Sequence, residues 1–173
     1  DGTVSFNFVN NNEGSNDPEE PGGDIVFKET FDKCNGTGGN DNSWDGTVAS
    51  SAFTPDNKDW TSPSSFGGNK CARFGAGKVA GSATTPQITI DGMTTMTFKA
   101  APWSNEQSTL EVTSSNENVV VSKTDFAMNN NVWNEITLTL TGNGDTKLTF
   151  AVKGKRFFLD NITLTKEATT GIS

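Results

Sequence analysis

Residues 133–152 read WNEITLTLTGNGDTKLTFAV. Every second residue is a large apolar one from Ile136 to Leu140, and again from Leu148 to Val152. A period of two indicates β-strands with one buried face. The centre of the stretch, residues 142–145, is rich in glycine, asparagine and aspartate, which favour a tight turn. The stretch therefore predicts two strands, 133–141 and 146–152, separated by a turn.

The same periodicity continues through the chain from Ile25, and helical periodicity is scarce. The predicted strands are 25–31, 47–53, 70–75, 86–91, 94–100, 108–113, 118–123, 133–141, 146–152 and 156–165. Short strands with turn residues at intervals of about 8–12 positions are typical of sandwiches. We therefore expect an all-β protein, a two-sheet antiparallel β-sandwich of jelly-roll type.

The first 24 residues differ from this body. Residues 3–9 alternate like one short strand, whereas residues 10–24 are acidic, rich in proline and glycine, and nearly free of apolar side chains. Such a segment cannot bury enough surface to fold alone, which indicates a linker. The predicted organisation is an extension and linker over 1–24, a β-sandwich domain over 25–165 and a tail over 166–173.

The composition excludes several kinds of chemistry. The chain has no histidine and two cysteines, so a Ser-His-Asp triad, a Cys-His pair and a tetrahedral zinc site are excluded. The net charge is −8, and the first 24 residues carry most of it, which leaves the body nearly neutral. A neutral body offers no basic surface for nucleic acid or for an acidic membrane. No apolar run approaches the roughly 18 residues of a membrane span.

The composition leaves two kinds of chemistry possible: catalysis by a pair of carboxylates, and calcium binding by oxygen ligands alone. A glycosidase needs two suitably spaced carboxylates, and Asp91, Glu111 and Glu135 are the candidates. Glu111 and Glu135 lie opposite the apolar positions of their strands, where a solvated charge is ordinary. An enzyme is therefore not expected.

Two other carboxylates interrupt apolar faces. Glu29 shares a face with Phe27 and Phe31, and Asp160 is in phase with Ile162 when residues are counted in twos. A buried carboxylate needs a partner cation, a metal ion or a proton. If the first and last strands of the body are neighbours, the two acids could share one calcium ion with backbone carbonyls. The alternatives are exposure at a frayed sheet edge, or pairing with a lysine or arginine.

Both ends of the body resemble a known family. The opening FKETFD (27–32) and the closing FFLDNI (157–162) resemble jelly-roll carbohydrate-binding modules that hold a structural calcium between their terminal strands. The segments FKETFDKCNGTGGNDNSWDG (27–46), KCARFG (70–75) and GKRFFLDNI (154–162) are similar to domains of secreted lipoproteins of Bacteroides-type gut bacteria. The resemblance covers about 25–165.

The resemblance implies a noncatalytic module that binds a polysaccharide or oligosaccharide at the bacterial cell surface. It places calcium ligands at Glu29 and Asp160, and Asp32 and Asn40 follow Glu29 closely enough to add oxygens. It further implies a secreted or outer-membrane location, with a lipid anchor upstream, and we expect a monomer. The alternatives are a scaffold domain without a sugar ligand and, third, a carboxylate-dependent glycoside hydrolase or lyase.

Four tryptophans are available for sugar recognition, because the apolar face of a sugar can pack on an indole ring. Trp60 and Trp103 lie in polar loop contexts and are the predicted platforms, with Trp44 as a third candidate. Trp133 opens a strand and is assigned to packing. For each platform candidate, the alternative is an anchor that holds its loop.

The two cysteines, Cys34 and Cys71, are compatible with one disulfide, although their spacing does not establish it. Both positions recur in the resembling proteins, and a secreted location permits a bridge. The resemblance therefore implies a Cys34–Cys71 disulfide.

Overall fold

A computed structural model describes residues 23–39, 51–106 and 108–168. These residues form twelve β-strands and no helix, which confirms the all-β prediction. In chain order the strands are β1 (Asp24–Glu29), β2 (Ser65–Gly67), β3 (Ala72–Phe74), β4 (Ser82–Thr84), β5 (Ile88–Asp91), β6 (Thr94–Pro102), β7 (Thr109–Ser114), β8 (Val119–Val121), β9 (Asp125–Ala127), β10 (Asn134–Thr146), β11 (Leu148–Lys153) and β12 (Phe157–Lys166). Within the described ranges, no helix is long and apolar enough to cross a membrane.

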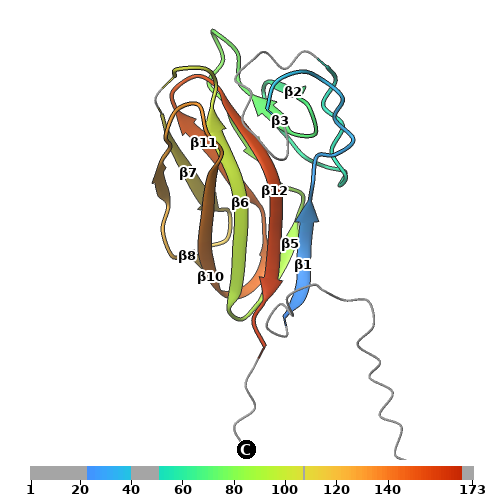
Figure 1. Ribbon diagram of the computed structural model, residues 1–173. Helices are drawn as coiled ribbons and strands as arrows, with labels where there is room; N and C mark the ends of the chain where they lie inside the picture. Colours follow the sequence, from blue (N-terminus) through green and yellow to red (C-terminus); the bar gives the residue numbers. More distant parts are fainter. Residues whose placement is uncertain (1–22, 40–50, 107, 169–173) are drawn as a thin grey trace, which may run out of the picture.

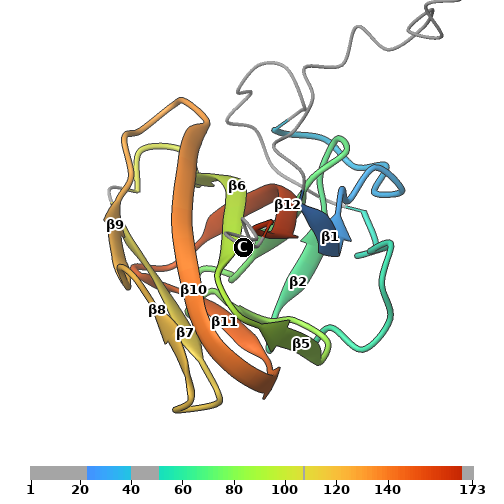
Figure 2. The same ribbon diagram turned by 90° about the horizontal axis from the view of Figure 1, so that it is seen from below.

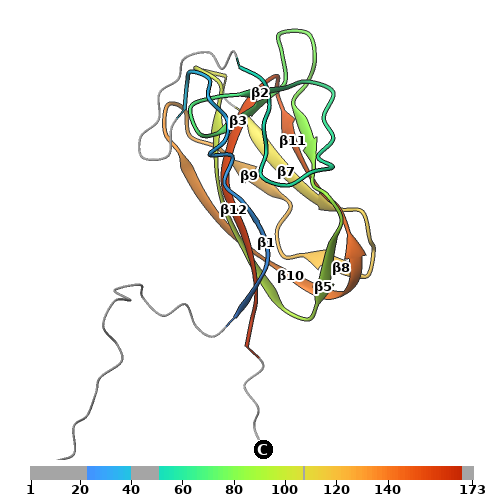
Figure 3. The same cartoon turned by 90° about the vertical axis from the view of Figure 1, so that its right-hand side faces the viewer.

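The strands build two antiparallel sheets that pack face to face (Figures 1 and 3). The large sheet has eight strands in the order β2-β3-β12-β6-β10-β5, with β1 paired to β12 and β8 paired to β10. The small sheet has the order β4-β11-β7-β9. Seen from below, β6, β12 and β1 lie side by side (Figure 2). The predicted two-sheet sandwich is confirmed, while the jelly-roll order of connections stays a prediction.

The main core fills the space between the sheets. Met96 and Phe98 of β6 and Leu138 of β10 face Leu110 and Phe150 of the small sheet, and all five are buried. The rings of Phe98 and Phe150 meet edge to face, with centroids 5.2 Å apart. Burial of each such side chain contributes about 1.5–3 kcal/mol to stability. Because side chains alternate along a strand, the residues between them point to the outer face of the large sheet.

The structure contradicts the predicted turn at residues 142–145. The strand β10 continues through this segment to Thr146 and pairs there with β5, while β11 belongs to the other sheet. Gly142 and Gly144 have φ angles of 120° and 133°. A side chain at Gly142 would also place its Cβ 1.8 Å from the carbonyl oxygen of Asn118. The glycines thus serve a bend and a close backbone approach within one long strand.

Several short elements also differ from the prediction. The three-residue strands β2, β4 and β9 do not correspond to predicted strands. The predicted strand 47–53 lies partly outside the described residues, and Ser51 makes only an isolated bridge to Gly67. Such short segments carry too few alternations to be recognised by periodicity.

A β-bulge in β12 changes which side chains face the core. Opposite β6, Asp160 pairs with Lys99 and Thr163 pairs with Thr97, so β12 has one extra residue between them. Asn161, within this bulge, has a φ of 47°, in the left-handed region. Leu159 before the bulge and Ile162 after it both pack in the main core. Asp160 therefore faces outward, opposite to the predicted phase.

Candidate functional site

Glu29 lies at the end of β1, and its carboxylate is fully buried. Its Oε1 atom accepts hydrogen bonds from the backbone N–H groups of Phe31 (3.2 Å) and Asp56 (2.7 Å). Its Oε2 atom accepts three more, from the backbone N–H of Asn57 (3.0 Å), the Asn57 side-chain amide (2.9 Å) and the indole N–H of Trp60 (3.0 Å). We call these five donors the Glu29 cage. Donors to an ionised carboxylate are among the stronger hydrogen bonds, so the cage compensates the buried charge.

Asp56 makes a second connection between the end of β1 and the loop that contains Asn57 and Trp60. It accepts hydrogen bonds from the backbone N–H of Thr30 (2.8 Å) and from its hydroxyl (2.5 Å). Burial opposes ionisation of Asp56, but the Thr30 hydrogen bonds and the nearby charge of Lys33 outweigh it and lower its pKa. The loop over residues 53–60 is thus fastened to the end of β1 by two carboxylates that point in opposite directions.

A calcium ion shared by Glu29 and Asp160 does not fit this geometry. The Glu29 cage directs the positive ends of five N–H groups at the carboxylate, where a calcium site needs further oxygen ligands. Asp160 lies on the other face of the large sheet, in register with Lys99, and accepts a hydrogen bond from the N–H of Asn161 (2.9 Å). The prediction that the two acids meet at one site is therefore wrong, because it did not include the bulge.

The other predicted calcium ligands do not complete a site. Asp32 is exposed in the turn after β1, and Asn40 lies outside the described residues. Across residues 23–39, 51–106 and 108–168, no three histidine, cysteine, aspartate or glutamate side chains gather closely enough to hold a metal ion.

Trp60 is an anchor of its loop. Its ring packs against Phe31 (centroids 5.5 Å apart), Phe27 (6.3 Å), Phe74 (6.4 Å) and Phe53 (6.5 Å), while its N–H bonds to the Glu29 carboxylate. These contacts pack the partly buried ring against the edge of the core. The structure thus favours the anchor alternative for Trp60 over the predicted sugar platform. Trp44 lies outside the described residues.

The two cysteines are free thiols, which contradicts the disulfide. Cys34 packs in the main core with its sulfur 3.7 Å from the carbonyl oxygen of Thr54, and Cys71 packs in a second apolar cluster with its sulfur 3.4 Å from the carbonyl oxygen of Gly38. Burial raises the pKa of the Cys34 thiol, which makes it a poor nucleophile.

We expect both thiols to be unreactive in the folded protein and reactive after unfolding. Titration with a thiol reagent should detect almost none in buffer and both of the chain's cysteines in denaturant without reductant. If no thiol were detected in denaturant without reductant, the two cysteines would be joined by the predicted disulfide after all.

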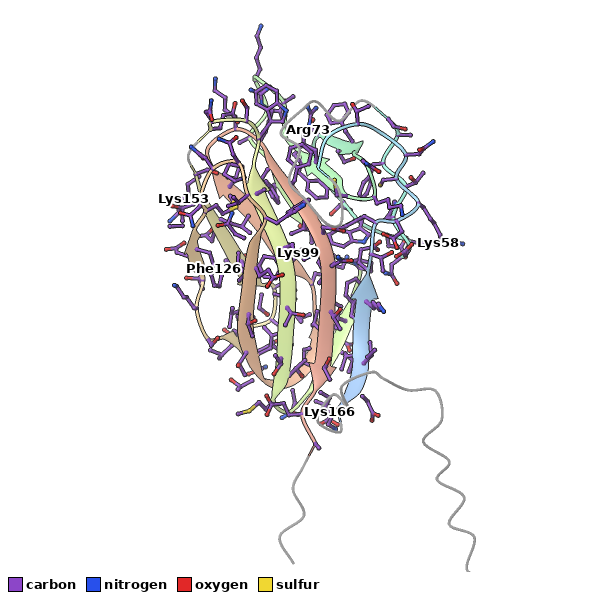
Figure 4. All side chains as sticks on the ribbon, viewed as in Figure 1. Lys58, Arg73, Lys99, Phe126, Lys153 and Lys166 are labelled. Carbon is purple, nitrogen blue, oxygen red and sulfur yellow. The ribbon has the colours of Figure 1, made fainter. Side chains whose placement is uncertain are left out.

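The middle of the outer face of the large sheet is polar. Its residues there, on β6, β10 and β12, are mostly hydroxylic: Thr95, Thr97, Lys99, Glu135, Thr137, Thr139, Thr163 and Thr165. The register places Thr97 directly between Thr137 and Thr163, and Lys99 beside Glu135. Figure 4 shows Lys99 over the middle of this sheet.

This face contains a depression of about 320 Å³, which we call the Thr97 hollow. The polar residues that line it come from three neighbouring strands: Thr97, Lys99, Glu135, Thr137, Asn161 and Thr163. They offer hydroxyl, amide, ammonium and carboxylate groups, so the hollow presents both donors and acceptors. The bulge at Asn161 forms part of its wall, and bulges are frequent beside functional sites.

A second apolar cluster lies at one end of the outer face. Cys71, Ala101 and Phe158 form its buried part, and Phe66, Trp103 and Trp133 pack against it. The last of these, Trp133, directly precedes β10 in phase with Glu135 of the hollow. Two partly buried indoles thus stand at the end of a polar, hydrogen-bonding surface.

No protein-family model and no curated protein matches the sequence. Among solved structures, the chain is similar to the Arthrobacter globiformis T6 isomalto-dextranase complexed with panose, with 18% sequence identity and a TM-score of 0.38. The match covers 61% of this chain and 20% of that chain.

Proposed function

We propose that the domain is a noncatalytic carbohydrate-binding module whose ligand lies in the Thr97 hollow. The observation that carries this proposal is the hollow itself, where three adjacent strands hold hydroxyl, amide and charged groups in register. Sugar hydroxyls need both donors and acceptors, and the apolar face of a sugar ring packs on aromatic side chains. The polar lining and the nearby Trp103 and Trp133 supply these two kinds of contact.

Binding without catalysis is favoured by the charges of the hollow. Hydrolysis of a glycosidic bond ordinarily uses a pair of carboxylates at a set separation. Among the residues that line the hollow, Glu135 is the one carboxylate, and Lys99 lies in register between Glu135 on β10 and the buried Asp160 on β12. The two carboxylates thus flank a lysine instead of facing each other across an open site, which suits hydrogen bonding to a ligand.

The proposed place of action is the bacterial surface, where a secreted or lipid-anchored module meets polysaccharides. This part of the proposal rests on the resemblance of the motifs at both ends of the body to carbohydrate-binding modules and to domains of secreted lipoproteins. A scaffold domain without a sugar ligand is the rival that the experiment must separate.

We expect a glycan array of plant, host and microbial polysaccharides to identify a ligand, and titration calorimetry to measure its affinity. The double variant Thr97→Val/Thr137→Val should weaken binding about tenfold or more, since each lost hydrogen bond contributes about 1 kcal/mol. Both side chains are exposed, so stability should change little.

The matched control is Thr113→Val/Thr124→Val, two exposed threonines on the side of the small sheet, which should bind like the wild type. If the two double variants bound the glycan with equal affinity, the ligand would not bind in the hollow. Absence of binding to every glycan would support the scaffold, and release of products would support an enzyme.

A further inference from the structure

The chain has two arginines, and both lie at the end of the outer face where β12 begins: Arg73 pairs with Phe158 of β12, and Arg156 directly precedes this strand. Arg73 is on β3, in one row with Phe66 on β2 and Phe158 on β12. Arg156 directly precedes β12 and stacks on Trp103, with its guanidinium carbon 3.6 Å from the ring centroid. In Figure 4, Arg73 lies beside β2 and β3, beyond Lys99.

Arg73 is buried although it has no polar partner among the described residues. Its exposed fraction is 6%, its guanidinium lies 4.3 Å from the centroid of the Phe66 ring, and its Nε atom is buried without a hydrogen-bond acceptor. The ion pairs between described residues do not include it. An arginine is almost never this buried unless it is paired. Within the described part of the chain, its guanidinium therefore lacks the anion that ordinarily accompanies such burial.

Glu106, whose charge acts on Arg73, is already paired with Arg156. Glu106 uses its Oε1 atom to accept hydrogen bonds from both Nε (3.1 Å) and Nη2 of Arg156. Among the described residues, Glu106 therefore pairs with Arg156 and makes no hydrogen bond or ion pair with Arg73. Burial lowers the pKa of Arg73, the charge of Arg156 lowers it further, and Glu106 partly opposes both.

Two further atoms at this end of the face have unused hydrogen-bonding capacity. The indole N–H of Trp103 is a buried donor without an acceptor, and the Oε2 atom of Glu106 is a buried acceptor without a donor. A ligand that carries an oxyanion next to hydroxyl groups offers acceptors for the Trp103 N–H and the Arg73 Nε–H and a donor for Glu106. A planar guanidinium fits a carboxylate or a sulfate through two parallel hydrogen bonds.

We propose that this end of the outer face binds the carboxylate or sulfate group of an acidic glycan, with Arg73 as the residue that pairs with it. The inference rests on the proposed carbohydrate binding and names the class of glycan. A uronic acid and a sulfated sugar would offer the same oxyanion chemistry, so the experiment includes both.

The direct test is a ¹⁵N NMR titration of the full chain, in which two arginines give two side-chain Nε–H resonances; Arg156→Gln assigns them. The probes are glucuronate, glucose 6-sulfate and glucose at one ionic strength. The Arg73 resonance should shift saturably with glucuronate, with the sulfate ester or with both. It should not respond to glucose or to sodium chloride. No shift with either acid, or an equal shift with sodium chloride, would overturn the inference.

The second test compares acidic glycans with neutral glycans of matched length. Arg73→Gln should weaken binding of the acidic members by about tenfold or more, as expected for the loss of charge-assisted hydrogen bonds, and should leave the neutral ones unchanged. Lys153→Gln, which removes an exposed positive charge from the small sheet, should change neither. A melting curve of each variant shows whether it is folded.

The two proposals fail in different ways. If the wild type binds neutral glycans as tightly as acidic ones and Arg73→Gln has no effect, only the present inference fails. If no glycan binds at all, the proposed carbohydrate binding fails.

Discussion

Glu29→Gln will lower the free energy of unfolding by about 3 kcal/mol or more. The glutamine amide would turn N–H groups toward N–H donors of the cage, and the remaining hydrogen bonds would lose their charge assistance. For a domain of this size, the midpoint of thermal unfolding should fall by roughly 6–12 °C. Thermal and urea unfolding of the variant and the wild type measure the change.

The matched control is Glu117→Gln, an exposed glutamate that should tolerate the same exchange. A chelator separates the cage from a metal site. We expect it to leave the melting temperature of the wild type unchanged, because five N–H groups rather than an ion hold Glu29. A melting temperature that falls with chelator in the wild type but not in Glu29→Gln would point to a bound metal.

The second large effect is expected at Gly142. Gly142→Ala should lower the free energy of unfolding by about 3 kcal/mol or more, because the new Cβ would meet a carbonyl oxygen 1.8 Å away at a φ of 120°. Urea unfolding provides the measurement. If this variant does not fold, its loss from the soluble fraction is the same result in a stronger form.

Two other glycines separate the causes of that effect. Gly92 has a φ of 86° and no neighbour within 4 Å of an added Cβ, so Gly92→Ala should cost only about 1 kcal/mol of backbone strain. Gly77 has free space without a positive φ, and Gly77→Ala should be nearly neutral. If Gly142→Ala were as mild as Gly77→Ala, β10 would not continue past Gly142 as the structure has it.

Alternation of apolar and polar residues was sufficient to predict the sandwich and most of its long strands. It failed at residues 142–145, because glycine serves equally well in a turn and in a bend of a continuous strand. The pairing of this segment with β5 decides between the two, and strand pairing is not a property of the segment itself. The predicted facing of the Asp160 side chain was wrong for a related reason. A single extra residue at Asn161 reverses which face of the sheet the neighbouring side chains of the strand point to.

The burial of Glu29 could be predicted, whereas the groups that stabilise it could not. Its donors come largely from Asp56, Asn57 and Trp60, which lie 27 to 31 positions away and are backbone groups in part. A backbone N–H has no sequence signature. The Thr97 hollow was missed because Thr97, Thr137 and Thr163 become neighbours only through the order of the strands. Each of them alone is an ordinary exposed or half-buried threonine of a strand.

The central claim, that a glycan binds on the outer face of the large sheet, is tested most directly by mapping backbone amide shifts in the ¹⁵N-labelled protein. The titrant is the tightest glycan from the array. Saturable shifts should concentrate at Thr97, Thr137 and Thr163 and extend to the indole N–H groups of Trp103 and Trp133. Shifts confined to the small sheet, or no shifts at saturating glycan, would contradict the claim.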